Sequence, residues 1–199
     1  MINSEVLSFG ELLLKYSEYN QVSIEQAYRR LFGEVVISQE MKSGTYRIIS
    51  KRLEVSENYH PYLLFYVQTD EYQNYKSLKK ILSVQIDHTD HQGVTRYYGG
   101  IIYVQLSHSQ LIYYCVDVMF YREGVETFVG SQPVELGGIY HYVFTLKQSE
   151  GKSTAFIVGG SICWPDSSFC YDNKEKKEQN RGRRRRRIRL SQQFCFNGN

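Results

Sequence analysis

Residues 111–121, "LIYYCVDVMFY", contain seven β-branched or aromatic side chains in eleven positions, as is typical of a β-strand. Similar short runs are "ILSVQID" (81–87), "GIIYVQL" (100–106), "VETFV" (125–129), "IYHYVFTL" (139–146) and "TAFIVGG" (154–160). Turn-forming stretches such as "DHQG" (90–93) and "REG" (122–124) separate the runs. We therefore predict an antiparallel sheet region from about residue 80 onward.

The preceding part of the chain shows a helical pattern instead. Apolar residues within 2–19 recur at spacings of three and four, at Val6, Phe9, Leu13 and Tyr16. This spacing predicts one face of an amphipathic helix. Ser23 and Gln26 fit a capping box and predict a second helix, which we expect to end before Gly44.

Residues 56–74, "SENYHPYLLFYVQTDEYQN", fit two interpretations. The run "YLLFYV" (62–67) is compatible with a strand. Tyr59, Leu63 and Tyr66 also share one helical face, and a helix is favoured because the segment is long. We therefore expect a third helix here.

Helices before strands predict an α+β fold. We expect a helical subdomain of about three helices at 1–78, packed on an antiparallel β subdomain at 79–170. The polar and basic residues 171–199 have little to bury and are expected to form a disordered tail.

The tail contains the strongest local signal, "RGRRRRRIRL" (181–190), with seven arginines in ten positions. They are Arg181, Arg183, Arg184, Arg185, Arg186, Arg187 and Arg189. Residues 171–199 carry a net charge of +7 and residues 1–170 one of −4. A basic arm of this kind predicts nuclear import, and weak, non-specific, salt-dependent contact with DNA.

The sequence contains no pattern that favours an enzyme or a resident cofactor. No Ser nucleophile elbow is present. The segment "DHTDHQG" (87–93) has two histidines and two aspartates that could ligate a metal, but its turn composition favours a hairpin loop. We therefore expect no metal site, and because no apolar run approaches 18 residues, we expect no membrane span.

Four cysteines lie at positions 115, 163, 170 and 195, without a C-x-x-C pair. The N-terminus lacks the basic and apolar regions of a signal peptide. Reduced thiols in the cytosol or nucleus are the simpler expectation, although Cys163 and Cys170 could pair under oxidation.

Several motifs resemble the activation domain of the papillomavirus early regulatory protein, the viral factor that controls transcription and loads the replication helicase. They are "AYRRLFGEVVISQEMKSG" (27–44), "LEVSENYHPYLLFYVQT" (53–69), "FVGSQPVELGGIYHYVF" (128–144) and "FIVGGSICWPDSS" (156–168). With the Arg-rich segment, the resemblance covers nearly all of residues 1–190. The dimeric DNA-binding barrel that follows the linker in that family is absent from this sequence.

The resemblance implies roles for individual residues. Glu34 stands at the second-helix glutamate that contacts the viral helicase. Tyr28, Arg30 and Leu64 stand at or near the surface for transactivation and for a host chromatin adaptor, although Phe32 occupies the position of the family's arginine. We expect Glu34 to be exposed on the second helix, with Ile24 and Leu31 facing inward.

The resemblance therefore implies a viral regulatory protein without enzymatic activity, acting in the host nucleus. Its expected partners are the viral replication helicase, host transcription and chromatin factors and, through the tail, DNA; a homodimer is possible. The alternative is a small nucleic-acid-binding or packaging protein that acts through the Arg-rich arm.

Overall fold

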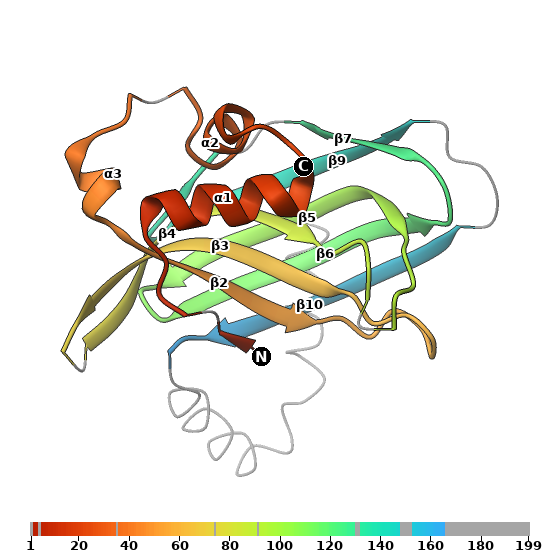
Figure 1. Cartoon of the computed structure of the whole chain (residues 1–199). Coiled ribbons are helices and arrows are strands. Elements are labelled where there is room, and N and C mark those ends of the chain that lie inside the picture. The colour runs from red at the N-terminus through yellow and green to blue at the C-terminus, as the bar shows by residue number, and fades with distance from the viewer. Residues whose placement is uncertain are drawn as a thin grey trace, which may run out of the picture.

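The computed structural model describes residues 2–3, 5–34, 36–73, 75–90, 92–129, 132–147 and 153–165. This part of the chain contains three helices and two antiparallel sheets, which confirms the α+β class (Figure 1). The helices are α1 (Phe9–Asn20), α2 (Ile24–Phe32) and α3 (Gln39–Ser43).

Each sheet has five strands among the described residues. The first sheet has the order β1 (Ile2–Asn3), β2 (Thr45–Arg52), β3 (Tyr62–Tyr72), β4 (Tyr75–Ile86) and β8 (Val134–Glu135). The second sheet has the order β10 (Thr154–Cys163), β6 (Leu111–Tyr121), β5 (Tyr97–His108), β9 (Ile139–Lys147) and β7 (Val125–Val129). Figure 1 shows α1 lying across the first sheet, with the second sheet behind it. The molecule therefore has three layers, in the order helices, first sheet, second sheet.

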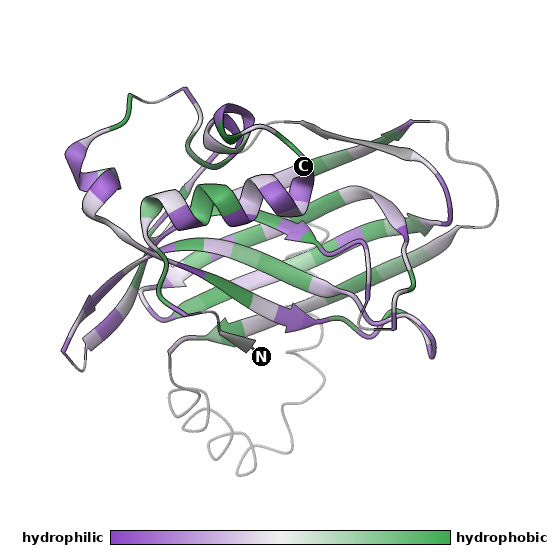
Figure 2. Cartoon of the chain, in the orientation of Figure 1, coloured by the Kyte–Doolittle hydropathy of each residue, from purple (hydrophilic) through white to green (hydrophobic). Residues whose placement is uncertain are grey.

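Two apolar clusters hold these layers together. Between the sheets, Leu63 and Phe65 of β3 belong to the same buried cluster as Val116 and Val118 of β6. Between the first sheet and the helices, a second cluster contains Leu12, Tyr16 and Leu31 of the helices together with Leu64, Tyr66 and Leu82 of the strands. The first sheet is thus covered on both faces. Figure 2 shows the strand centres as mostly apolar, and α3 and the far end of the β3–β4 hairpin as mostly hydrophilic.

The expected third helix at 56–74 is wrong, because this segment contains β3. Residues Leu63 to Thr69 are buried without interruption, since odd positions face the second sheet and even positions face the helices. A strand buried on both faces has a continuous apolar run, which lacks the alternation that identifies a strand. The segment's length and shared helical face were therefore misleading.

The second helix is shorter than expected and begins as expected. Ser23 accepts a hydrogen bond from the backbone of Gln26, whose side chain accepts one from the Ser23 backbone, so the capping box is confirmed. The helix ends at Phe32 because Gly33 adopts a φ of 72°. A separate short helix, α3, ends at the expected Gly44. Leu31 is buried as expected, but Ile24 is 45% exposed, so its inward position is wrong.

All six strands expected after residue 80 are present as β4, β5, β6, β7, β9 and β10. The division at residues 78 and 79 stays a prediction, although β2 and β3 lie before it and β4 crosses it. The tail at 171–199, with its expected disorder, lies outside the described residues. None of the described helices combines the length and apolar character needed to cross a membrane.

Candidate functional site

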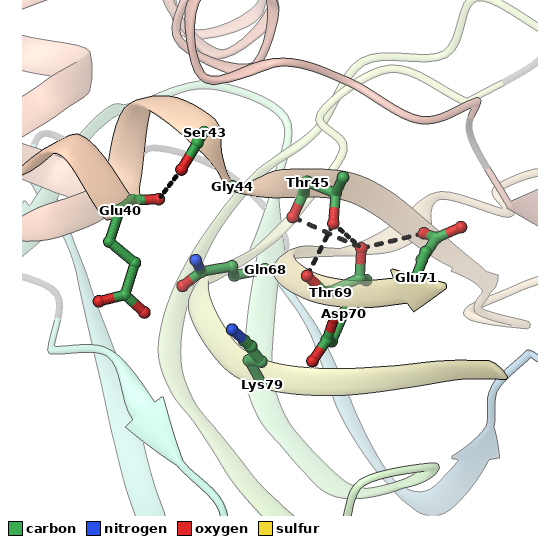
Figure 3. A pocket seen from close by; sticks show the side chains of 9 residues that line it. All are labelled: Glu40, Ser43, Gly44, Thr45, Gln68, Thr69, Asp70, Glu71 and Lys79. Atoms are coloured by element: carbon green, nitrogen blue, oxygen red, sulfur yellow. Dashed lines mark hydrogen bonds between the residues drawn. The ribbon is translucent and has the colours of Figure 1, made fainter. Parts of the chain in front are cut away.

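A polar cavity of about 220 Å³ lies between α3 and the adjoining ends of β2, β3 and β4 (Figure 3). Its lining is formed by Glu40, Ser43, Gly44, Thr45, Gln68, Thr69, Asp70, Glu71 and Lys79. Most of these side chains carry a charge or a hydrogen-bonding group. The cavity therefore suits a hydrophilic ligand better than an apolar one.

On one side of the cavity, side chains of β2 and β3 form a hydrogen-bond network. The Thr45 hydroxyl donates to the carbonyl oxygen of Thr69 at 2.7 Å, and the Thr69 hydroxyl donates to Glu71 Oε1 at 2.9 Å. Arg47 donates to the same carboxylate through Nε at 2.6 Å and Nη2 at 2.8 Å. The side chains of Arg47 and Glu71 are only 11% and 12% exposed.

This two-point contact sets the charge state of Glu71. The hydrogen bonds from Arg47 are the main cause that holds the pKa of Glu71 below its ordinary value. The same pairing raises the pKa of Arg47, whose Cζ also lies 5.7 Å from the ring centroid of Trp164. Glu71 is therefore ionised but already neutralised by Arg47, so it contributes structure to the cavity wall more than charge.

Gln68 is the mostly buried side chain of the cavity whose polar atoms the rest of the described fold does not engage. Only 7% of this residue is exposed, and among the described residues its side-chain amide forms no hydrogen bond. Figure 3 shows the amide projecting from β3 into the space between Glu40 and Lys79. The backbone of Gly44 passes close to this amide, since a Cβ there would lie 2.9 Å from both Gln68 Nε2 and the Tyr46 hydroxyl. The rest of Gln68 is packed in the fold, and its amide opens on the cavity, where water or a ligand can satisfy it.

A bulge in β4 places Lys79 at the same cavity. Gln68 pairs with Lys80 and Thr69 with Leu78, so the ladder passes over Lys79. A second irregularity lies on the other side of Gln68, between Tyr66 and Val67. Bulges redirect side chains and are frequent beside functional sites.

Three charged groups at the cavity have no ion pair within the described part of the chain. Glu40, Asp70 and Lys79 are exposed, and none of them takes part in the salt bridges of this structure. Because Glu71 is paired with Arg47, these three groups leave the cavity with a net charge of about −1 at neutral pH. The arrangement can therefore bind donors and acceptors at once, with a preference for cations.

A second surface lies at the end of α2. Glu34 is exposed, as expected, but it lies in the turn after the helix and not on the helix itself. Two residues further along the chain, Val36 is 85% exposed and Ile37 is 45% exposed. We call residues 33–34 and 36–38 the α2–α3 corner.

The other residues expected at the transactivation surface lie in the helical layer or beneath it. The ring of Tyr28 is half-buried and stacks on Phe32 with a centroid distance of 5.5 Å. Arg30 is half-buried and lies against Tyr16, where its charge partly offsets the rise in the Tyr16 pKa that burial causes. Leu64 lies on β3 and is 9% exposed in the cluster beneath the helices. Leu64 therefore offers almost none of its side chain to a partner.

The segment at 87–93 lies in the connection between β4 and β5, but the expected hairpin is wrong, because these two strands belong to different sheets and do not pair with each other. Both Asp90 carboxylate oxygens accept backbone hydrogen bonds, Oδ1 from Gln92 and Val94 and Oδ2 from His60. Asp90 therefore organises the loop. Within the described ranges, no group of three or more His, Cys, Asp or Glu side chains is placed to hold a metal ion. His91 lies outside those ranges.

The expectation of reduced thiols is wrong for two of the cysteines, because Cys115 and Cys163 are both disulfide-bonded. They are not bonded to each other. Cys115 lies opposite Gly159 in the β6–β10 ladder and Cys163 lies opposite Leu111, which separates them by four strand positions, roughly 13 Å. Cys170 and Cys195 lie outside the described residues, as do all seven arginines of the tail.

The cavity was missed by the sequence reasoning, although two signals were present. "QTDE" (68–71) places polar and acidic residues directly after an apolar strand core. "KSGT" (42–45) places a glycine between a helix and a strand. Assigning 56–74 to a helix separated these segments.

No family model, no curated protein and no solved structure matches this chain.

Proposed function

We propose that this chain is a non-enzymatic regulatory protein that binds other proteins through the α2–α3 corner. The observation that carries the proposal is Val36, which is 85% exposed two residues from the exposed carboxylate of Glu34. Neighbouring exposed apolar side chains, here Val36 and Ile37, with polar groups at their rim are typical of protein-binding surfaces. The corner also lies on the outer, helical layer, where a partner has free access.

The resemblance of the sequence motifs indicates which protein would bind the α2–α3 corner. In the papillomavirus family, the glutamate that corresponds to Glu34 contacts the replication helicase, so we propose the cognate viral helicase as the partner of the corner. We propose roles in viral transcription and replication on the same basis. Host transcription and chromatin factors would bind the same helical layer, of which Tyr28 and Arg30 are the half-buried members.

The test measures helicase binding by the full chain. Glu34→Ala is expected to weaken binding by about 1–3 kcal/mol, the range of a hydrogen bond to a charged group. Val36→Ser is expected to weaken it as well, through lost apolar contact. Glu57→Ala removes an equally exposed carboxylate from a turn remote in sequence and is the matched control. Parent-like binding by Glu34→Ala and Val36→Ser would contradict the proposal.

The Arg-rich tail separates this proposal from the nucleic-acid-binding alternative. Removing residues 171–199 should leave helicase binding unchanged. The same deletion should abolish DNA binding, which is expected to be weak and to fall steeply with salt because it rests on arginine–phosphate contacts. Loss of helicase binding together with DNA binding would favour the alternative.

The proposed host nucleus requires its own test, because disulfides such as those of Cys115 and Cys163 are rare in reducing compartments and argue against it. Alanine at all five positions from Arg183 to Arg187 should abolish nuclear accumulation of a fusion too large to diffuse through pores. Unchanged accumulation would show that this run is not the import signal.

A further inference from the structure

The polar cavity contains a group that the fold itself does not use. Gln68 is more than nine-tenths buried, yet its amide hydrogen-bonds to no other described residue. A glutamine amide offers an acceptor oxygen and two N–H donors. This amide opens on the cavity, between two irregularities of the β4 ladder, so a ligand in the cavity can complete its hydrogen bonds.

The exposed charges define what that ligand would carry. Glu40 and Asp70 provide two carboxylates, and Lys79 provides one ammonium group. A basic α-amino acid has the complementary set, because it carries two cationic groups and one carboxylate. Its guanidinium or ammonium groups would face the carboxylates and the Gln68 oxygen, and its α-carboxylate would face Lys79.

Size and charge disfavour other classes of ligand. The volume of about 220 Å³ lies below the roughly 300–1,000 Å³ of sites for drug-sized molecules, and so suits a molecule of amino-acid size. A bare divalent cation would be attracted by the two carboxylates, but it would leave the Lys79 ammonium and the Gln68 N–H donors without a partner. A phosphate or other anion would be repelled by Glu40 and Asp70.

We propose that this cavity binds a basic α-amino acid, with Gln68 as its buried anchor and with Asp70, Glu40 and Lys79 as its charged contacts. The proposal is independent of the α2–α3 corner. Two sources provide this chemistry, the free amino acid and an arginine residue within a peptide.

The experiment titrates the full chain with L-arginine and follows backbone amide signals by NMR. Saturable shifts are expected at residues 43–45, 68–71 and 79, with a Kd of about 1 mM or below. L-Citrulline has the same shape without the guanidinium charge and is expected to bind at least about tenfold more weakly, a loss of about 1.4 kcal/mol. Absence of saturable shifts at these residues, or equal binding of citrulline, would overturn the proposal.

A second ligand distinguishes the two sources. N-acetyl-L-arginine N-methylamide lacks both α charges and represents arginine within a peptide. If it binds about tenfold more weakly than L-arginine, the site is assigned to the free amino acid through Lys79. If both bind equally, the site is assigned to an arginine side chain of a peptide. Both results support the proposed guanidinium recognition.

Variants of the cavity complete the test. Gln68→Leu keeps the approximate volume but removes the amide, and is expected to weaken L-arginine binding at least about tenfold. Asp70→Asn changes an exposed side chain, so it keeps the test decisive if Gln68→Leu does not fold. Glu18→Gln on α1 removes the same charge away from the cavity and should bind as the parent does. Parent-like binding by Asp70→Asn and Gln68→Leu would overturn the proposal.

Discussion

Strands β3 and β6 each have 11 residues, but they bury their side chains in opposite ways. From Leu63 to Thr69, β3 buries seven residues in succession. In β6 the buried residues alternate with exposed ones, such as Tyr113 and Met119 at 44% and 41% exposure. The cause is the layer that each strand occupies, because β3 lies between the helices and the second sheet and β6 has the core on one side only.

This difference shows that position in the layers sets the burial pattern of a strand. Both strands are rich in aromatic and β-branched residues. Of the two, only β6 alternates buried and exposed positions, as a strand with one face toward the core does. Cys115 is the exception on the outer face of β6, with 5% exposure and a disulfide bond.

The largest expected effect tests the two buried faces of β3. Leu63 and Leu64 are adjacent, yet Leu63 faces the second sheet and Leu64 faces the helices. Leu63→Ala and Leu64→Ala should each lower the free energy of unfolding by about 2–5 kcal/mol, because each leaves a cavity in a separate core. Equilibrium denaturation in urea measures both, from the shift in midpoint at constant m. A cost below about 1 kcal/mol at either position would show that β3 has only one buried face.

The same contrast explains what could be predicted from the sequence. The strands after residue 80 were predicted from their short β-branched and aromatic runs and from the turn residues that separate them. β3 was assigned to a helix because no local signal shows that two layers cover one strand. The polar cavity depends on the pairing of β2, β3 and β4, so its residues could not be grouped before those strands were known. Leu64 was expected at a surface because the resemblance placed it at an apolar contact position of the third helix, whereas it lies on β3 beneath the helices.

The second effect concerns the polar end of the first sheet, at the Arg47–Glu71 pair. Glu71→Gln should cost about 1–3 kcal/mol at pH 7, since a hydrogen-bonded charge pair that is mostly buried loses one partner. The folded-state pKa of Glu71 is below its ordinary 4.5, so its stabilisation is present above that pH and is lost as pH falls through the folded-state value. The difference between parent and variant should therefore shrink in acid.

Denaturation midpoints at pH 7, 5, 4 and 3 would measure this change. Glu25→Gln is the matched control, because Glu25 pairs with Arg29 on the exposed face of α2, with 74% and 63% of the side chains exposed. That pair should contribute no more than about 0.5 kcal/mol at any pH. A constant difference between parent and Glu71→Gln from pH 7 to pH 3 would contradict the assigned charge state.

A smaller loss of stability is expected from a change in α2, one of the helices that cover the second face of β3. Ser23→Ala removes the hydroxyl that accepts the Gln26 backbone N–H at 3.1 Å, and should cost about 1 kcal/mol. Ser107→Ala, at an exposed position of β5, should change stability by less than about 0.5 kcal/mol. Thermal unfolding followed by circular dichroism would compare the two variants. If both substitutions lowered the free energy of unfolding equally, the Ser23 cap would not contribute to the stability of α2 on the first sheet.

The smallest effect is expected on the open face of the second sheet. Ile157 of β10 is 60% exposed, and Thr keeps its β-branched shape, so Ile157→Thr should change stability by less than about 0.5 kcal/mol. Val118→Thr on the adjacent β6 makes a similar exchange at a position that is 2% exposed, and should cost about 1–3 kcal/mol because the hydroxyl enters the core. Urea midpoints of both variants give the contrast. If Ile157→Thr cost as much as Val118→Thr, this face would be covered in solution, and the second sheet would resemble the first in having two buried faces.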